Sequence, residues 1–258
     1  MPAQNTPRGR LSLSVDLPQC RASSPTSPRT NSAQRLLAAW QKQPLPLTWV
    51  WSGNPPQSTT ELAELTALPR TDLGWAIPVS GLSRQQYRAQ ILGWLKQWQA
   101  ALKSPGNRLR MVVTHAGKVS IPYDALTRAG ISVQRDGQLQ SGHGAFSQPR
   151  WMHSGLWQLP LQAEMQLTQG WISSTAANWR LQGLLRQLLH SPGMHLHLRI
   201  DLGQREEMGG TVLANWEKLL HILAGFVQQG GEIDQAARIC ADLAAQHQRS
   251  AGSILRAA

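Results

Sequence analysis

Polar and apolar residues alternate over residues 11–16, where Leu11, Leu13 and Val15 are separated by polar side chains. A period of two is typical of a strand with one apolar and one polar face. The same alternation over residues 195–201 places four polar side chains on one face: His195, His197, Arg199 and Asp201. Both segments are therefore predicted to be strands that present polar groups on one side.

Longer segments repeat apolar residues every three or four positions, which predicts amphipathic helices. They cover residues 31–41, 60–68, 83–102, 121–129, 176–189, 211–228 and 234–249. Short apolar runs predict further strands over residues 47–51, 73–79, 109–113, 131–134 and 156–161. Ser83 and Gln86 form a capping-box pattern at the start of one helix. This order of strands and helices favours an α/β fold with a parallel sheet, either doubly wound or a barrel.

The length of 258 residues and the 41% share of hydrophobic residues suit one large domain with its own core. We expect residues 1–10 to form a flexible tail and residues 11–258 to form a single domain. No apolar stretch reaches the roughly 18 residues that a membrane helix needs. The first ten residues hold no apolar leader, so a cytoplasmic location is expected. The two cysteines, Cys20 and Cys240, exclude a disulfide scaffold and are interpreted as small apolar residues.

The chain is basic, with a formal net charge of +11, and 20 of its 25 basic residues are arginine. Residues 1–150 hold 17 basic and 6 acidic residues, whereas residues 151–258 hold 8 of each. Such a bias can attract polyanions. The basic residues are scattered rather than grouped, so drift in composition explains the bias equally well.

The layout of the chain resembles the polysaccharide deacetylase (NodB homology) family over nearly its whole length. The family's opening strand and its acidic motif correspond to Ser14-Val15-Asp16-Leu17-Pro18, and its segment with two histidines corresponds to residues 74–80. Later family segments correspond to residues 111–115, to Ala129-Gly130-Ile131 and to Leu196-His197-Leu198. The resemblance implies a single-domain, distorted (β/α)7 barrel with its site at the carboxyl ends of the strands.

The resemblance also implies metal-dependent hydrolysis of an N-acetyl group on a polysaccharide. By position, Asp16 would be the catalytic base and His197 the acid. The family's metal ligands fall at Leu17, Ala76 and Ser80, of which the first two have no lone pair to offer and the third has only a hydroxyl. A family arginine falls near residues 112–113, where two valines stand.

We therefore expect a carbohydrate-related, deacetylase-like protein without a metal cofactor, which is non-catalytic and binds a glycan or a protein partner. Whether an activity remains is left open, because an active hydrolase could use a relocated site made of Asp16, His195 and His197. A second alternative is an Arg-rich domain that binds polyanions. The binding residues expected under the first reading are His195, Arg199, Asp201, Trp51 and Trp75.

The aromatic residues are biased towards tryptophan, with 11 Trp against 2 Phe and 2 Tyr. Five tryptophans at helical spacing are expected in the core: Trp40, Trp94, Trp98, Trp179 and Trp216. Five others in expected loops or strand ends are the candidates for a binding surface: Trp51, Trp75, Trp151, Trp157 and Trp171. Loop positions are also expected for His115, His143 and His153, and Glu206-Glu207 is either a rim carboxylate pair or an acidic first turn of a helix.

Overall fold

The computed structural model describes residues 9–17, 29–55, 67–78, 83–102, 109–114, 121–139, 146, 148–152, 155–167, 175–203 and 210–257. The strands are β1 (Arg10–Asp16), β2 (Leu47–Ser52), β3 (Thr71–Ala76), β4 (Leu109–Thr114), β5 (Val133–Leu139), β6 (Arg150–Trp151), β7 (Trp157–Leu161), β8 (Ala163–Gln166), β9 (His195–Asp201) and β10 (Glu232–Ile233). The helices are α1 (Arg29–Lys42), α3 (Arg84–Ala101), α4 (Tyr123–Arg128), α5 (Thr175–Leu189), α6 (Gly210–Gln228) and α7 (Ala236–Ala257).

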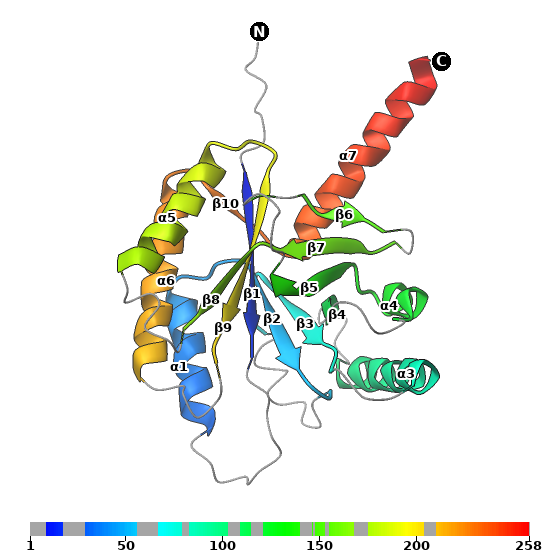
Figure 1. Ribbon diagram of the computed structural model, residues 1–258, viewed down its shortest axis with the longest axis horizontal. Helices are drawn as coiled ribbons and strands as arrows, with labels where there is room; N and C mark the ends of the chain where they lie inside the picture. Colours follow the sequence, from blue (N-terminus) through cyan, green and yellow to red (C-terminus); the bar gives the residue numbers. More distant parts are fainter. Residues whose placement is uncertain are drawn as a thin grey trace.

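The strands form one sheet in the order β6-β7-β5-β4-β3-β2-β1-β9-β8, and β10 pairs with the start of β1. All of its pairings are parallel except that of β6 with β7. The first strand lies near the middle, because β9 returns to pair with it over its full length (Figure 1). The carboxyl ends of β1 and β9 therefore lie together. The alternation of polar and apolar residues predicts each strand but not that the two are neighbours.

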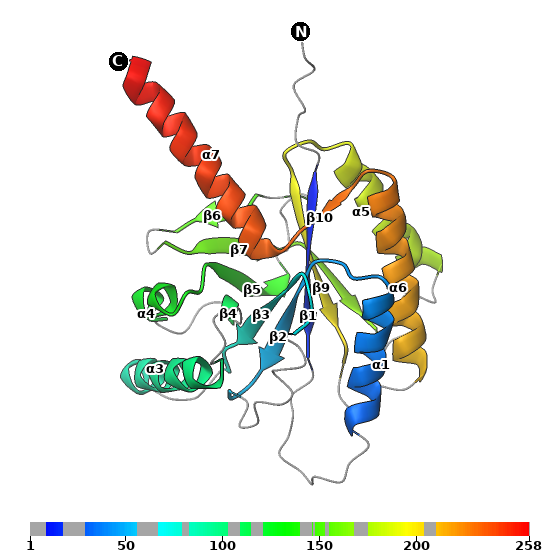
Figure 2. The same ribbon diagram turned by 180° about the vertical axis from the view of Figure 1, so that it is seen from behind.

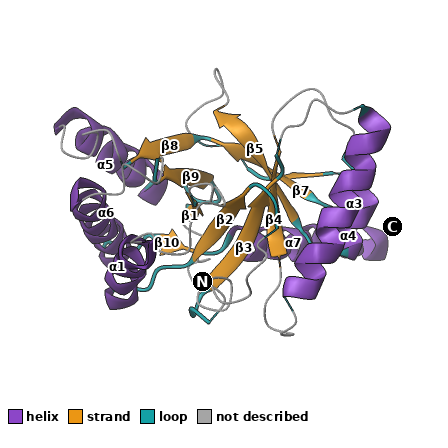
Figure 3. Ribbon diagram, turned by 90° about the horizontal axis from the view of Figure 1, so that it is seen from below, coloured by secondary structure: helices purple, strands orange, loops and turns teal. Residues whose placement is uncertain are grey.

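Two groups of helices flank the sheet. Helices α1, α5 and α6 lie beside the half that contains β1, β8 and β9, whereas α3 and α4 lie beside the other half (Figures 1 and 3). Helix α7 starts against the sheet and projects away from the body of the domain, which is clear in the reverse view (Figure 2). Among the described helices, none is long and apolar enough to span a membrane.

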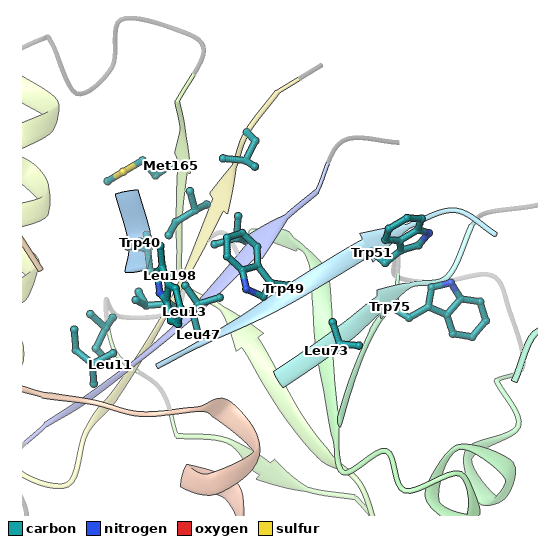
Figure 4. Close-up of a cluster of buried hydrophobic side chains, with 14 of the residues drawn as sticks. Leu11, Leu13, Trp40, Leu47, Trp49, Trp51, Leu73, Trp75, Met165 and Leu198 are labelled. Atoms are coloured by element: carbon teal, nitrogen blue, oxygen red, sulfur yellow. The ribbon is translucent and has the colours of Figure 1, made fainter. Parts of the chain in front are cut away.

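The main core fills the space between the sheet and these flanking helices. Leu11, Leu13 and Val15 of β1 are buried there, as the alternation of the strand requires. Indole rings supply much of the packing: Trp49 lies 6.4 Å from Trp216 between ring centroids, and the cluster continues along β2 and β3 (Figure 4). The capping box predicted at Ser83 is present at the start of α3.

A second apolar cluster lies on the opposite face of the sheet. It joins Val50, Met111, Val113, Val133, Trp157 and Leu159 to the first turns of α7 through Ala236 and Cys240. The Cys240 side chain is buried, and burial raises the pKa of its thiol to about 12. Cys240 therefore packs as the small apolar residue that the sequence predicts.

Strands β7 and β8 are separated in the chain by Gln162 alone, yet they pair with opposite halves of the sheet. The side chain of Gln162 bonds to the backbone of β9: its Oε1 accepts from the N–H of His197 at 2.6 Å and its Nε2 donates to the carbonyl of His195 at 3.1 Å. The chain thus crosses at Gln162 from one half of the curled sheet to the other, and the Gln162 side chain bonds to β9 where no described backbone ladder joins β7 to β9. We refer to these two bonds as the stitch at Gln162.

The predicted α/β class and the strongly curled parallel sheet of a distorted barrel are confirmed, but the described strands do not close the barrel. Two details of the prediction were wrong. It missed the short strands β6, β8 and β10, and it ended the strand over residues 131–134 too early, because β5 runs to Leu139. Pro160 lies within β7 without breaking it, because β6 pairs with β7 only at Trp157 and Gln158, and the missing N–H of the proline removes no bond from that ladder. The helix expected over residues 60–68 lies almost wholly outside the described residues.

Candidate functional site

The polar faces of β1 and β9 meet in the interior of the curled sheet. In the parallel register of these strands Ser12 lies beside His197, Ser14 beside Arg199, and Asp16 beside Asp201. Because residues of equal register on neighbouring strands point to the same face, the polar side chains form a column along the two strands. The first and the last long strand are therefore adjacent, and the three residues of the relocated-site alternative, Asp16, His195 and His197, lie on this one polar face.

Two histidines and two serines form the inner part of this column. Ser12 Oγ lies 2.9 Å from His195 Nε2 and 2.7 Å from His197 Nδ1, and Ser14 Oγ lies 3.0 Å from His197 Nε2. His195 and His197 are 3% and 0% exposed. Both nitrogens of His197 are therefore satisfied within the protein, and neither ring faces solvent.

Burial keeps both imidazoles neutral. It lowers the pKa of His195 to about 3, with a smaller contribution from Arg10. The pKa of His197 is also lowered well below its ordinary value, first by burial and then by the charges of Arg135 and His195. Among the described residues His195 Nδ1 has no hydrogen-bond partner. A pair of neutral, buried rings can relay a hydrogen bond but does not gain a proton at neutral pH.

The column ends at Asp16, which two arginines hold. Arg135 Nη1 and Nη2 donate to the two carboxylate oxygens at 2.8 and 2.9 Å, and Arg199 Nε donates to Oδ2 at 2.7 Å. Arg135 also donates to Ser14 Oγ, so the ion pair is continuous with the histidine–serine chain. Each oxygen of Asp16 therefore accepts at least one charge-assisted hydrogen bond, which is the strong kind.

Arg199 carries the network to the carboxyl rim of the sheet. Its Nη1 lies 3.1 Å from Glu164 Oε1, and its Nη2 lies 3.5 Å from Asp201 Oδ2. The side chains of Arg199, Glu164 and Asp201 are 21%, 26% and 26% exposed. Asp201 in turn accepts from the backbone N–H of Gly203 at 2.8 Å. We refer to Arg199, Glu164 and Asp201 as the charged rim.

This arrangement decides what Asp16 can do. A general base needs a free lone pair aimed at the proton that it removes. Arg135 and Arg199 occupy three of the roughly four lone-pair positions of the Asp16 carboxylate, one at Oδ1 and two at Oδ2. The carboxylate is therefore held in one orientation and has little free capacity to accept a further proton donor in this conformation.

The three residues of the relocated site do not converge. His197 reaches Asp16 only through Ser14 and Arg135, which stand between them in the hydrogen-bond chain. Across the parts of the chain that the structure describes, no group of three or more His, Cys, Asp or Glu side chains is placed to hold a metal ion. The donor set at this end of the sheet thus does not fit a metal site of the kind that the resemblance implies.

The positions that the resemblance aligns with the family's metal ligands also bear on whether this chain could hold a metal ion. Leu17 follows β1, where its N–H donates to the carbonyl of Val50 at 2.9 Å, and its side chain packs on the main core. Ala76 ends β3 and packs on the second apolar cluster. The two side chains therefore lie at the same edge of the sheet but join different clusters, while Ser80 lies outside the described residues.

The structure corrects the expected exposure of Trp51 and Trp75. Both indoles are buried side by side on β2 and β3, at 9% and 0% exposure, and their N–H groups donate to the carbonyls of Asn54 and Gly53 (Figure 4). Trp75 also packs edge-on against Trp94, with ring centroids 5.7 Å apart. A position at a strand end predicts an exposed side chain, but helix α3 covers the ends of these two strands and buries both indoles.

Other tryptophans also differ from expectation. Trp179 was expected in the core but is 78% exposed on α5, because the apolar stripe of that helix runs through Leu181, Leu185 and Leu188 instead. Trp157 was expected at the surface but is buried, whereas Trp151 is 57% exposed as expected. Several candidate residues lie outside the described part of the chain: Cys20, His115, His143, His153, Trp171, Glu206 and Glu207.

Sequence reasoning missed Arg135, Gln162 and Glu164. The resemblance directed attention to residues 112–113 for an arginine, and the structure pairs Val113 with Arg135 in the register of β4 and β5. The guanidinium thus comes from the neighbouring strand at the same level. The sequence signal that could have found Arg135 is its place two positions after the apolar Val133, since strand alternation puts both side chains on one face.

No protein-family model and no curated protein sequence matches this chain. Solved structures do match. The similar structures are polysaccharide deacetylases of carbohydrate esterase family 4 and pseudoenzymes of that family. The same family was named from the order of motifs in the sequence.

Three of these structures give the extent of the likeness. A peptidoglycan deacetylase from Bacillus subtilis is 14% identical, with coverage of 96% of each chain and a TM-score of 0.46. A family 4 carbohydrate esterase from Bacillus anthracis is 12% identical over 91% of this chain and 84% of that one, with a TM-score of 0.47. A family 4 pseudoenzyme from Bacillus anthracis is 11% identical over 91% of this chain and 66% of that one, with a TM-score of 0.47.

Proposed function

We propose that this chain is a deacetylase-like protein that has exchanged catalysis for binding, and that it recognises a glycan at the charged rim. The observation that carries the proposal is the position of Asp16 between Arg135 and Arg199. Three hydrogen bonds from these two arginines hold both oxygens of the carboxylate, which opposes its use as a base that takes a proton from a water molecule. The positions that the resemblance assigns to metal ligands are Leu17, Ala76 and Ser80, of which the first two offer no ligand atom and the third only a hydroxyl.

The charged rim supports a glycan as the ligand. Sugar hydroxyls both donate and accept hydrogen bonds, and Glu164, Asp201 and Arg199 provide acceptors and donors within one ion-paired cluster. The rim holds one guanidinium and two carboxylates, a formal net charge of −1, so it favours a neutral hydroxyl-rich ligand over a polyanion. The partial exposure of all three side chains leaves them accessible while the network holds their geometry.

A deacetylation assay tests the loss of catalysis. The purified protein would be incubated with acetylated chito-oligosaccharides and, in turn, zinc, cobalt and nickel, with release of acetate as the measurement. We expect release at the level of the buffer with each metal. Metal-dependent release that Asp16→Asn removes would overturn the proposal and would show that Asp16 leaves its arginine partners during the reaction.

A binding titration tests the rim. We expect the same oligosaccharides to bind, and Glu164→Gln to weaken binding by about tenfold, since a hydrogen bond to a charged group is lost. Glu217→Gln on the exposed face of α6 is the matched control and should bind like the unchanged protein. Equal affinity in both variants would contradict a role for the rim. Binding to heparin that falls steeply with added salt would instead support the polyanion alternative.

A further inference from the structure

A cavity of about 180 Å³ lies between β8 and α5, next to the stitch at Gln162. Its walls are largely apolar and come from three parts of the fold: Leu139 of β5, Ala163 and Met165 of β8, Leu198 of β9, and Leu181 and Leu184 of α5. The polar residues on its wall are Gln162, Glu164 and Arg180. The cavity is separate from the interior column, because β9 turns Leu198 towards it and His197 and Arg199 to the other face.

The size and the entrance of the cavity suit an alkyl chain. An apolar cavity of about 150 Å³ is large enough to hold a six-carbon ring. Leu139 is 50% exposed and is one of the few large apolar residues on the described surface. An exposed leucine on the wall of an apolar cavity extends the apolar surface towards solvent, so a chain entering there loses contact with water along its length.

The charges at the cavity favour an anionic head group. Glu164 is paired with Arg199 at 3.1 Å, which offsets its negative charge. The amide of Gln162 is occupied by the backbone of β9. Arg180 is exposed, and no carboxylate lies within ion-pair distance of it in the described part of the chain. The group at the cavity that is free to bind an ion is therefore a guanidinium, which matches a carboxylate with two parallel donors.

We propose that this cavity binds a medium-chain carboxylate, with an aliphatic chain of about six to eight carbons among the leucines and the carboxylate on Arg180. This site borders the charged rim through Glu164, but its ligand is held by Arg180 and the leucines, so the variants that test it leave the rim residues unchanged. Leu139 and Arg180 are the exposed residues of the wall, whereas Met165, Leu181 and Leu198 are buried, so the chain would point inwards and the carboxylate outwards.

Calorimetric titration with octanoate tests the proposal, with heptan-1-ol as a neutral chain of similar length. Arg180→Gln should weaken the binding of octanoate by about tenfold and leave the affinity for heptan-1-ol unchanged, because the variant removes the charge and keeps the cavity. Leu184→Trp should abolish binding of both ligands by filling the cavity. Arg186→Gln, on an exposed position of the same helix, is the matched control and should bind like the unchanged protein.

Circular dichroism of each variant checks that it folds. If Leu184→Trp does not fold, Ala163→Met narrows the same cavity from the β8 side and should weaken both ligands. Two results would overturn the proposal. One is the absence of octanoate binding to the unchanged protein at millimolar concentration, and the other is equal octanoate affinity in the unchanged protein, Arg180→Gln and the folded cavity-filling variant.

Discussion

Arg135 and Asp16 stand 119 positions apart in the chain and form a two-point ion pair in the interior of the curled sheet. The Arg135 side chain is 1% exposed and that of Asp16 is 10% exposed. The pair joins β5 to β1 across the concave face, although three strands separate these two in the sheet. The ion pair therefore links two distant strands of the sheet and also fixes the orientation of the Asp16 carboxylate.

Removal of Asp16 alone should be costly. Asp16→Leu leaves the guanidinium of Arg135 buried beside Ser14 without a counter-charge, for which we expect a loss of about 3–5 kcal/mol in the free energy of unfolding. The double variant Asp16→Leu/Arg135→Met should recover most of this loss, because it removes both charges. Urea unfolding monitored by circular dichroism measures both values. If Asp16→Leu costs less than about 0.5 kcal/mol, the ion pair is not a brace.

The two buried histidines should make the protein sensitive to acid. The pKa of His195 is lowered to about 3 and that of His197 is lowered too, while both take their ordinary value of 6.5 in the unfolded chain. Between these values the unfolded chain binds more protons, so stability falls as pH falls below 6.5. Two such groups give a slope of up to about 2.7 kcal/mol per pH unit.

Unfolding free energies measured between about pH 4.5 and pH 8 check this slope. The variant His195→Gln/His197→Gln should be less stable at the upper end of the range, since it disturbs the bonds to Ser12 and Ser14, but its dependence on pH should be flatter. An equally steep slope in the variant would show that other groups cause the loss in acid.

Ionisation of Asp72 should affect the pH dependence of stability in the opposite direction to the two histidines. Burial raises the pKa of its carboxyl to about 6, Arg110 lowers it, and Asp234 raises it further. The folded protein then holds a proton on Asp72 that the unfolded chain releases above its ordinary value of 3.8, so this group loses stability as pH rises through 4 to 6. Asp72→Asn should stabilise the protein by up to about 3 kcal/mol at neutral pH and by almost nothing near pH 4. A gain of equal size at both pH values would contradict the raised pKa.

The stitch at Gln162 can be tested with two variants of graded severity. Gln162→Ala removes both bonds to the backbone of β9, for which we expect a loss of about 1–3 kcal/mol. Gln162→Glu keeps the acceptor for the N–H of His197 and loses the donor to the carbonyl of His195, and it places a charge where the amide was. Hydrogen exchange at the amide of His197 separates the two variants: we expect fast exchange in Gln162→Ala and slower exchange in Gln162→Glu. Protection of that amide in Gln162→Ala would show that another group holds the edge of the sheet.

The sequence predicted much of this architecture because local patterns carry it. Alternation assigned β1 and β9 and the face on which His195, His197 and Arg199 lie, and the helix that starts at Ser83 was predicted from its capping box. What alternation does not give is the partner of each polar group. The resemblance assigns Asp16 the role of base, and nothing local shows that Arg135 reaches its carboxylate from a strand 119 positions away.

The misplaced tryptophans have a similar cause. Trp51 and Trp75 lie near the ends of β2 and β3, which α3, a later helix, covers, so their burial depends on tertiary packing and not on their own segments. Trp179 shows the converse, because its helical spacing also fits the face that α5 turns to solvent. Periodicity thus assigns an element and its two faces, whereas the choice of the covered face needs the neighbouring elements.

The late return of β9 to β1 has a consequence for biosynthesis. Ser12 meets His195 across 183 positions, and about three quarters of the chain must leave the ribosome before β9 can pair with β1. Until then β1 has β2 on one side and an open hydrogen-bonding edge on the other. Pairings of such long sequence separation slow folding and leave nascent chains exposed to aggregation. We therefore expect truncated chains that end before residue 195 to depend on chaperones, whereas the full chain buries that edge itself.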